Sequence, residues 1–122
     1  MVDQVKDKQS SSDQMIIIEK HERVIGYLYP IIQRTPRQHA IVRDKMLSCL
    51  FDLASFIMQA GKAGHISKLY AADANLAMLR FYLRFYQEGI RHLTTKQERH
   101  AQALIAEVGA LLGAWINRKK GN

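Results

Sequence analysis

The sequence predicts an all-α protein, an antiparallel four-helix bundle that assembles into oligomers. Four long amphipathic segments are separated by short connections, a pattern typical of such bundles. Strand-type alternation of apolar and polar residues is not sustained anywhere in the 122 residues, and only two of them are proline. Hydrophobic residues make up 48% of the chain, which is enough for the core of one domain. We expect a disordered polar tail over residues 1–14 and the four-helix bundle domain over residues 15–122.

The first helix is expected at about residues 16–34. Its apolar residues recur at helical spacing: Ile17, Ile18, Val24, Ile25, Leu28, Ile31 and Ile32. Pro30 lies inside this pattern and has no backbone N–H, so it should bend the helix or split it. Thr35 and Pro36 then supply a cap and a first-turn proline for the next helix.

The second helix is expected at about residues 36–62. Five apolar residues share one face and three more widen it: Ala40, Leu47, Leu50, Ala54 and Ile57, with Phe51, Leu53 and Met58. A helix with so wide an apolar face is predicted to be central, with little free surface. Gly61 and Gly64 mark its end and a short turn.

The third helix is expected at about residues 66–92. Apolar residues step by three and four along its whole length: Leu69, Ala72, Leu76, Leu79, Leu83, Tyr86, Ile90 and Leu93. Such a sustained seam should face the other helices of the bundle.

The fourth helix is expected at about residues 95–119. Thr94 and Gln97 form a capping box at its start. Its expected seam consists of Ala101, Leu104, Val108, Leu111 and Trp115. Gly109 and Gly113 are spaced so that another helix could approach closely, although this motif is best attested in membranes.

The third helix also has a second apolar face, nearly opposite its seam. Met78, Phe81 and Phe85 lie there. A monomer rarely exposes such a patch, so we predict that these three residues form an oligomer interface. The alternative is that the first helix folds across the third, because that arrangement would bury the same rings.

Basic residues form three groups that could contact an anionic partner. Arg80, Arg84 and Arg91 lie along a flank of the third helix, between its two apolar faces. The other groups are Arg34, Arg37, Arg43 and Lys45 near the corner of the first two helices, and residues 118–120 at the end of the fourth.

The net charge of +7 favours an anionic partner about as much as it favours solubility alone. Residues 1–14 contain three aspartates and two lysines, so the positive charge belongs to residues 15–122. A guanidinium group binds two phosphate oxygens at once, so contact with phosphate or with an acidic partner is one interpretation of the first two groups. The alternative is a solvated stripe with incidental pairs such as Arg84 with Glu88.

The sequence does not predict catalysis, a cofactor or a metal site. Cys49 is the only cysteine and has apolar neighbours, so it should be buried. His21 and Glu22 begin a zinc-protease motif, but Ile25 stands where the second histidine would be. No segment approaches the roughly 20 apolar residues of a membrane span, and no signal peptide is visible. We therefore expect a non-enzymatic, cytoplasmic protein without membrane contact.

Several stretches together carry a family resemblance. They are YPII at 29–32, TPR at 35–37, NL, LRF and LR within 75–84, LTTKQ at 93–97 and GALLGAW at 109–115. In order and spacing they resemble the accessory variability determinant (Avd) family of diversity-generating retroelements, over about residues 16–118. The resemblance rests on the combined series, because none of these motifs is diagnostic alone.

The resemblance implies a partner set and a role. Avd proteins are basic four-helix bundles that assemble as a pentameric barrel and bind an error-prone reverse transcriptase and nucleic acid. The complex makes mutated cDNA from a template RNA, and that cDNA replaces part of a target gene (retrohoming). By this resemblance the partners are the reverse transcriptase, RNA or cDNA held through its phosphate backbone, and further copies of the chain. Arg80 and Arg84 align with basic positions of the family's third helix.

Two other identities stay open at the level of the sequence. The first is a protein–protein adaptor without direct nucleic-acid contact. The second is the related family of bundles encoded in intervening sequences of bacterial 23S rRNA genes. Members of that family carry an Asn-Ile-Ala-Glu-Gly-like segment where residues 56–61 here read FIMQAG, which favours the Avd family. The tail over residues 1–14 is longer than the Avd family would lead us to expect.

Overall fold

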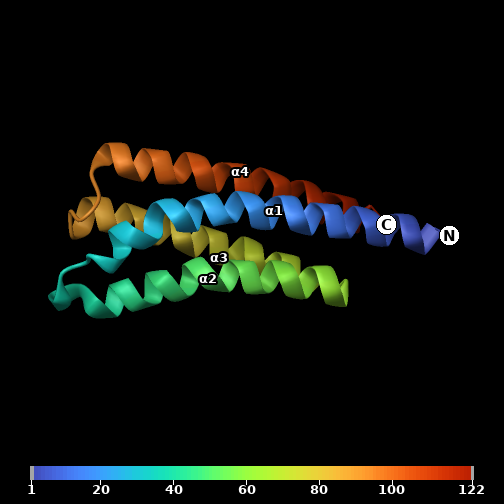
Figure 1. Cartoon of the computed structure of the whole chain (residues 1–122), viewed down its shortest axis with the longest axis horizontal. Coiled ribbons are helices and arrows are strands. Elements are labelled where there is room, and N and C mark those ends of the chain that lie inside the picture. The colour runs from blue at the N-terminus through green and yellow to red at the C-terminus, as the bar shows by residue number, and fades with distance from the viewer. Residues whose placement is uncertain (1, 122) are drawn as a thin grey trace.

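The computed structural model describes the backbone of residues 2–121 and the side chains of residues 12–62 and 64–121. Four long helices make up the fold: α1 (Val2–Gln33), α2 (Ala40–Ala63), α3 (Ile66–Arg84) and α4 (Thr95–Lys120) (Figure 1). A short 3-10 helix, η1 (Arg37–His39), precedes α2, and a single π-helical turn, η2 (Phe85–Gly89), follows α3. None of residues 2–121 lies in a strand. The predicted all-helical fold with four helices is confirmed.

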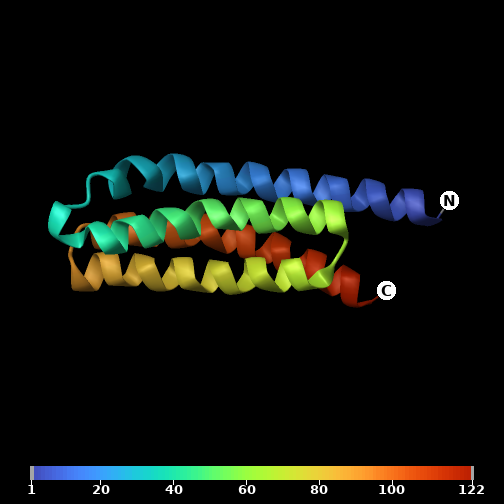
Figure 2. The ribbon, with the colours of Figure 1, turned by 90° about the horizontal axis from the view of Figure 1, so that it is seen from below.

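The four helices occupy the corners of a bundle. The main helix contacts join α1 to α2, α2 to α3, α3 to α4, and α4 back to α1, so α1 and α3 lie at diagonal corners. Figures 1 and 2 show the connections 34–39 and 85–94 at one end and both chain termini at the other. Each helix therefore has one side facing the core and one side facing away from it.

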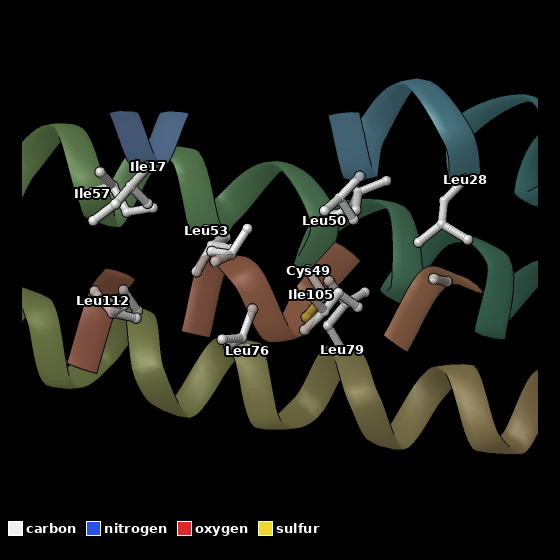
Figure 3. Close-up of a cluster of buried hydrophobic side chains, with 14 of the residues drawn as sticks. Ile17, Leu28, Cys49, Leu50, Leu53, Ile57, Leu76, Leu79, Ile105 and Leu112 are labelled. Carbon is white, nitrogen blue, oxygen red and sulfur yellow. The ribbon is translucent and has the colours of Figure 1, made fainter. Parts of the chain in front are cut away.

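A single apolar core runs along the bundle axis, and Figure 3 shows its middle part. In α1 the buried residues follow one another by four, three, four and four: Ile17, His21, Val24, Leu28 and Ile32. In α3 the predicted seam is buried as expected, from Leu69 to Leu83. These residues are within a few per cent of complete burial, so apolar surface taken from water holds the helices together.

The seam of α4 differs from the prediction. Ile105 and Leu112 are fully buried, whereas the expected Leu104 and Leu111 only pack partly against the core. Both three-residue and four-residue steps from Ala101 reach apolar side chains, so the spacing alone could not distinguish the two seams. The predicted capping box is present, because Thr94 and Gln97 exchange hydrogen bonds of 3.0 Å each.

The prediction that the second helix has little free surface is wrong. Phe51 and Met58 are 46% and 47% exposed, and the inward positions belong instead to Met46 and Cys49 along with Leu50 and others. The physical reason is the corner position of α2, which leaves one side of the helix without a neighbour.

The helix α1 begins well before the expected residue. Its backbone is helical from Val2, which differs from the disordered tail expected over residues 1–14. No glycine or proline precedes Gly26, and Asp13 and Gln14 already contact other helices. Met1 and the side chains of residues 2–11 lie outside the described part of the chain. Pro30 does not split α1, because the helix continues to Gln33.

The third helix ends earlier than expected. α3 stops at Arg84, and the π-helical turn η2 replaces the last part of the expected helix. The ring of Phe85 lies over Gly89, where an added Cβ would come within 2.7 Å of it. Beyond Gly89 the chain turns back, because the backbone N–H groups of His92 and Leu93 both donate to the carbonyl of Tyr86.

Among the described residues of α1 that are buried in the core, only His21 has a titratable side chain. Its side chain is 1% exposed, and Nε2 donates to the Leu50 carbonyl of α2 at 2.6 Å. Its Nδ1 has no partner among the described residues. Burial lowers the pKa of His21 below its ordinary value of 6.5, while the hydrogen bond to Leu50 acts in the opposite direction.

We expect acid to destabilise the fold through His21. Because the pKa is lower in the folded state, the unfolded chain binds a proton first, and the free energy of unfolding falls as the pH drops below 6.5. His21→Gln keeps a donor for Leu50 but does not titrate. Its stability should depend less steeply on pH, by up to about 1.4 kcal/mol per pH unit. Urea unfolding of both proteins between about pH 5 and pH 8 measures the difference. Equal slopes would show that His21 is protonated as readily in the folded protein as in the unfolded one.

Candidate functional site

The second apolar face of α3 is exposed. Met78, Phe81 and Phe85 are 46%, 50% and 40% exposed, and we call these three residues the α3 apolar face. The alternative in which the first helix covers these rings is wrong, because α1 packs against α2 and α4. Apolar side chains of this size in one exposed row mark a surface suited to a macromolecular partner.

Arg80 and Arg84 extend from α3 beside this face. Arg80 lies half-buried in a shallow groove between α3 and α4, with Asp73, Ala77 and Gly109. Its guanidinium rests over α4, since a Cβ added at Gly109 would be 3.1 Å from Nη2. No carboxylate of the described residues lies within 4 Å of either guanidinium.

The alternative pairing of Arg84 with Glu88 is not formed. The π-helical turn that begins at Phe85 changes the angular spacing of the residues that follow it. No carboxylate oxygen of Glu88 lies within 4 Å of the Arg84 guanidinium, and both side chains are exposed. Arg84 keeps a free guanidinium beside the α3 apolar face.

Arg91 does not belong to this flank, contrary to the prediction. It lies in the connection after η2, with a left-handed backbone at φ 55°. A non-glycine residue in that conformation costs roughly 1–2 kcal/mol, which the surrounding hydrogen bonds must offset. The connection 85–94, which bears Arg91, lies at the same end of the bundle as the connection 34–39, which bears Arg34 and Arg37 (Figure 2).

Two side-chain hydrogen bonds tie residues 85–94 to the end of α1 and to Thr35. His92 Nε2 donates to the Ile31 carbonyl at 2.8 Å. The hydroxyls of Thr35 and Tyr86 lie 2.7 Å apart, and Thr35 also donates to the Ile32 carbonyl. Thr35 is thus a buried link between connections and not the helix cap that was expected.

The residues of the second basic group differ in their exposure and in their acidic neighbours. We call Arg34, Arg37 and Arg91 the loop-end arginines, and all three are exposed. Arg43 Nε is 3.0 Å from the Asp44 carboxylate, so it has a local partner. Lys45 is exposed on α2, in a shallow groove that also holds Asp44 and Asp52. Unlike Arg43, the loop-end arginines have no carboxylate within 4 Å among the described residues.

The third basic group closes the opposite end of the bundle. Arg118 pairs with Asp13 of α1. Lys119 donates to the Gly64 carbonyl at 3.4 Å, and Lys120 lies 5.8 Å from the centre of the Tyr70 ring. Each of these three side chains contacts a different helix or helix end, so their charges are engaged within the chain.

Cys49 is held as a thiol. It is 7% exposed, and Sγ donates to Asn75 oxygens at 3.3 and 3.4 Å. Burial, together with the charge of Asp52, raises the pKa of Cys49 to about 11. Across the described residues, no three or more His, Cys, Asp or Glu side chains are placed to hold a metal ion. In the same part of the chain, no helix is long and apolar enough to cross a membrane.

Sequence reasoning missed a second exposed apolar surface, which lies between α1 and α2. The apolar side chains Met15, Tyr29, Phe51 and Met58 are all more than one third exposed there, and with Glu19 and Glu22 they form what we call the α1/α2 surface. The signal was present: Ile16, Ile17 and Ile18 together exceed what one helix face can bury.

Comparison with known families gives one assignment. A family model described as bAvd-like matches residues 15–119, which include all of α2 and α3 and nearly all of α4. The comparison with curated proteins finds no match.

Substitution of two glycines in α4 tests the position of Arg80. Alanine is better than glycine inside a helix by about 1 kcal/mol. Nothing lies within 4 Å of a Cβ added at Gly113, so Gly113→Ala should raise the free energy of unfolding by most of that amount. At Gly109 the new Cβ would be 3.1 Å from Arg80 Nη2 and 3.2 Å from Leu76 Cδ2. Gly109→Ala should therefore raise the free energy of unfolding, measured by urea unfolding, by clearly less than Gly113→Ala does. Equal gains would show that Arg80 does not rest on Gly109.

Proposed function

The chain belongs to the bAvd-like family, and from this premise we propose that it is the non-catalytic accessory protein of a diversity-generating retroelement. In this proposal it binds the element's reverse transcriptase and its template RNA or cDNA. It thereby supports synthesis of mutated cDNA and transfer of that cDNA to the target gene.

The observation that carries the proposal is the pair of free guanidinium groups on α3. Arg80 and Arg84 have no carboxylate within 4 Å among the described residues, in a chain of net charge +7. Guanidinium groups bind phosphate oxygens in a bidentate manner and tolerate partial burial, as at Arg80. Contacts to the phosphate backbone carry little base specificity, which suits a protein that must hold a whole template.

The loop-end arginines supply a second contact region in this proposal. Arg34, Arg37 and Arg91 lie at the end of the bundle, and the hydrogen bonds of Thr35 and His92 fix the connections that bear them. Arg43 and Lys45 lie further along α2 and contribute less, because acidic residues accompany them. A long nucleic acid or an extended protein surface could bridge the α3 arginines and this end.

Self-association completes the proposed function. We assign the contact between copies to the α3 apolar face, and the pentamer number comes from the family resemblance. Repetition of Arg80 and Arg84 around an assembly would add their charges into a strong local field. The accessory protein would then act as a basic scaffold on which enzyme and template meet.

A salt titration with charge-reversal variants tests the arginine contacts. For the wild-type chain, affinity for unrelated RNAs should fall about tenfold or more between about 50 and about 200 mM salt, because phosphate binding releases counterions. Arg80→Glu with Arg84→Glu should weaken RNA binding at low salt and flatten the salt dependence. The matched control is Arg23→Glu with Lys62→Glu, which changes the same amount of charge on exposed sites of α1 and α2. The control pair should bind nearly as the wild type does.

Two results would distinguish phosphate contact from the adaptor role, and light scattering adds a control. Wild-type affinity that stays flat over this salt range would contradict phosphate contact. Loss of reverse-transcriptase binding with RNA binding intact, in the Arg80 and Arg84 variant, would favour the adaptor role. Light scattering of the same samples shows whether any loss of binding follows a loss of assembly.

A further inference from the structure

The α1/α2 surface is an apolar groove that no part of the described chain covers. Met15 is 71% exposed, and Phe51 and Met58 are each close to half exposed. Tyr29 meets Phe51 edge to face, with ring centres 5.8 Å apart, which continues the surface from α1 onto α2. In Figure 2 these two helices lie side by side over much of their length. Exposed apolar side chains in such a row do not stabilise a monomer, so a partner that covers them is the better explanation of their exposure.

Charge limits the kind of partner that can fit. The described residues that line the groove include two acidic side chains, Glu19 and Glu22, and no basic one. Both glutamates are exposed, and neither has a basic partner within 4 Å among the described residues. An acidic apolar groove on a basic protein repels phosphate and attracts an apolar surface with positive flanks. Nucleic acid is therefore the wrong occupant for this groove.

A surface with the required chemistry is present on the same chain. The α3 apolar face offers Met78, Phe81 and Phe85, and Arg84 lies between the two rings in sequence with its guanidinium free. Apolar side chains of similar size would meet on both sides, and Arg84 could approach Glu19 or Glu22 at the rim. In that assembly Arg80 and the loop-end arginines would carry the phosphate contacts of the proposed function. Rim ion pairs of this kind add about 1 kcal/mol or less, but they orient the two surfaces.

The two surfaces cannot meet within one molecule. α3 lies diagonally across the bundle from α1 and does not pack against it, so the α3 apolar face does not cover the α1/α2 surface of its own chain. We infer that the α1/α2 surface is the docking site for the α3 apolar face of a second copy of this chain. The inference rests on the proposed self-association and adds the surface that receives the α3 apolar face.

The contact is therefore heterologous, with different patches on the two copies. After a first contact forms, one copy keeps its α1/α2 surface unused and the other keeps its α3 apolar face unused, so the contact repeats until a ring closes. An isologous dimer, in which two α3 apolar faces meet each other, would leave the α1/α2 surface exposed. The two arrangements differ in how single-surface variants behave when they are mixed.

Complementary variants test the pairing. Met58→Asp blocks the α1/α2 surface, and Phe81→Asp blocks the α3 apolar face. Ile41→Asp is the matched control, because Ile41 is 74% exposed on α2 and belongs to neither surface. Each substituted side chain is about half exposed or more, so the fold should persist, and circular dichroism checks it. Phe51→Asp is a second variant of the α1/α2 surface in case Met58→Asp unfolds.

Light scattering at high protein concentration gives the readout. The wild type and Ile41→Asp should share one mass, several times 14.0 kDa. Met58→Asp and Phe81→Asp should each be a monomer alone. An equimolar mixture should give a dimer of twice 14.0 kDa and nothing larger, because one intact surface remains on each variant and they complement each other.

Three outcomes would overturn the inference. If Met58→Asp and Phe51→Asp keep the wild-type mass, the α1/α2 surface takes no part in assembly. If the two monomeric variants stay monomeric when mixed, the contact is not between these two surfaces. A wild type that is itself a monomer would overturn the inference and the proposed self-association together. RNA binding, measured separately in the salt titration, would still decide the arginine contacts.

Discussion

The structure depends on one constraint: each helix of the bundle can bury only the side that faces the other three. The inward stripe of α1, from Ile17 to Ile32, and that of α3, from Leu69 to Leu83, satisfy it and build one continuous core. Apolar residues beyond those stripes have no place inside the molecule. Phe81 on α3 and Phe51 on α2 are such residues, and their exposure follows from the packing itself. A surface that the fold cannot cover alone is the physical basis for assigning it a partner.

The same packing determines which charges are available. At the end that holds both termini, Arg118 and Lys119 are engaged by Asp13 and the Gly64 carbonyl, so they complete the bundle. At the other end, Thr35 and His92 fix the connections through a buried and a part-buried hydrogen bond, while the arginines of those connections stay exposed. Arg84, just before the π-helical turn at the end of α3, has no carboxylate within 4 Å among the described residues. Among the described residues, Arg118 is thus neutralised by Asp13, whereas no carboxylate lies within 4 Å of Arg80, Arg84 or the loop-end arginines.

The spacing of apolar residues predicted the features that the local sequence determines. It missed the features that depend on how the helices pack against one another. The seam of α3 and the capping box at Thr94 were predictable, because spacing and residue type decide them within a few turns. The rotation of α4, which buries Leu112 instead of Leu111, was not, since both steps reach an apolar residue. The position of Arg91 depends on a turn in which the Phe85 ring lies over Gly89 and Arg91 takes a left-handed backbone, and helical spacing does not reveal either feature. The exposure of Phe51 required knowing that α2 stands at a corner.

The central claim is that another copy of the chain covers the outward side of α3. Phe81→Trp places a fluorescent reporter there, and Trp115, at 1% exposure, supplies a constant buried background. At concentrations where the chain assembles, the account predicts blue-shifted emission that acrylamide quenches poorly. On dilution to the monomer, the emission should shift to the red and become open to quenching. Emission typical of a water-exposed indole at every concentration would contradict the account.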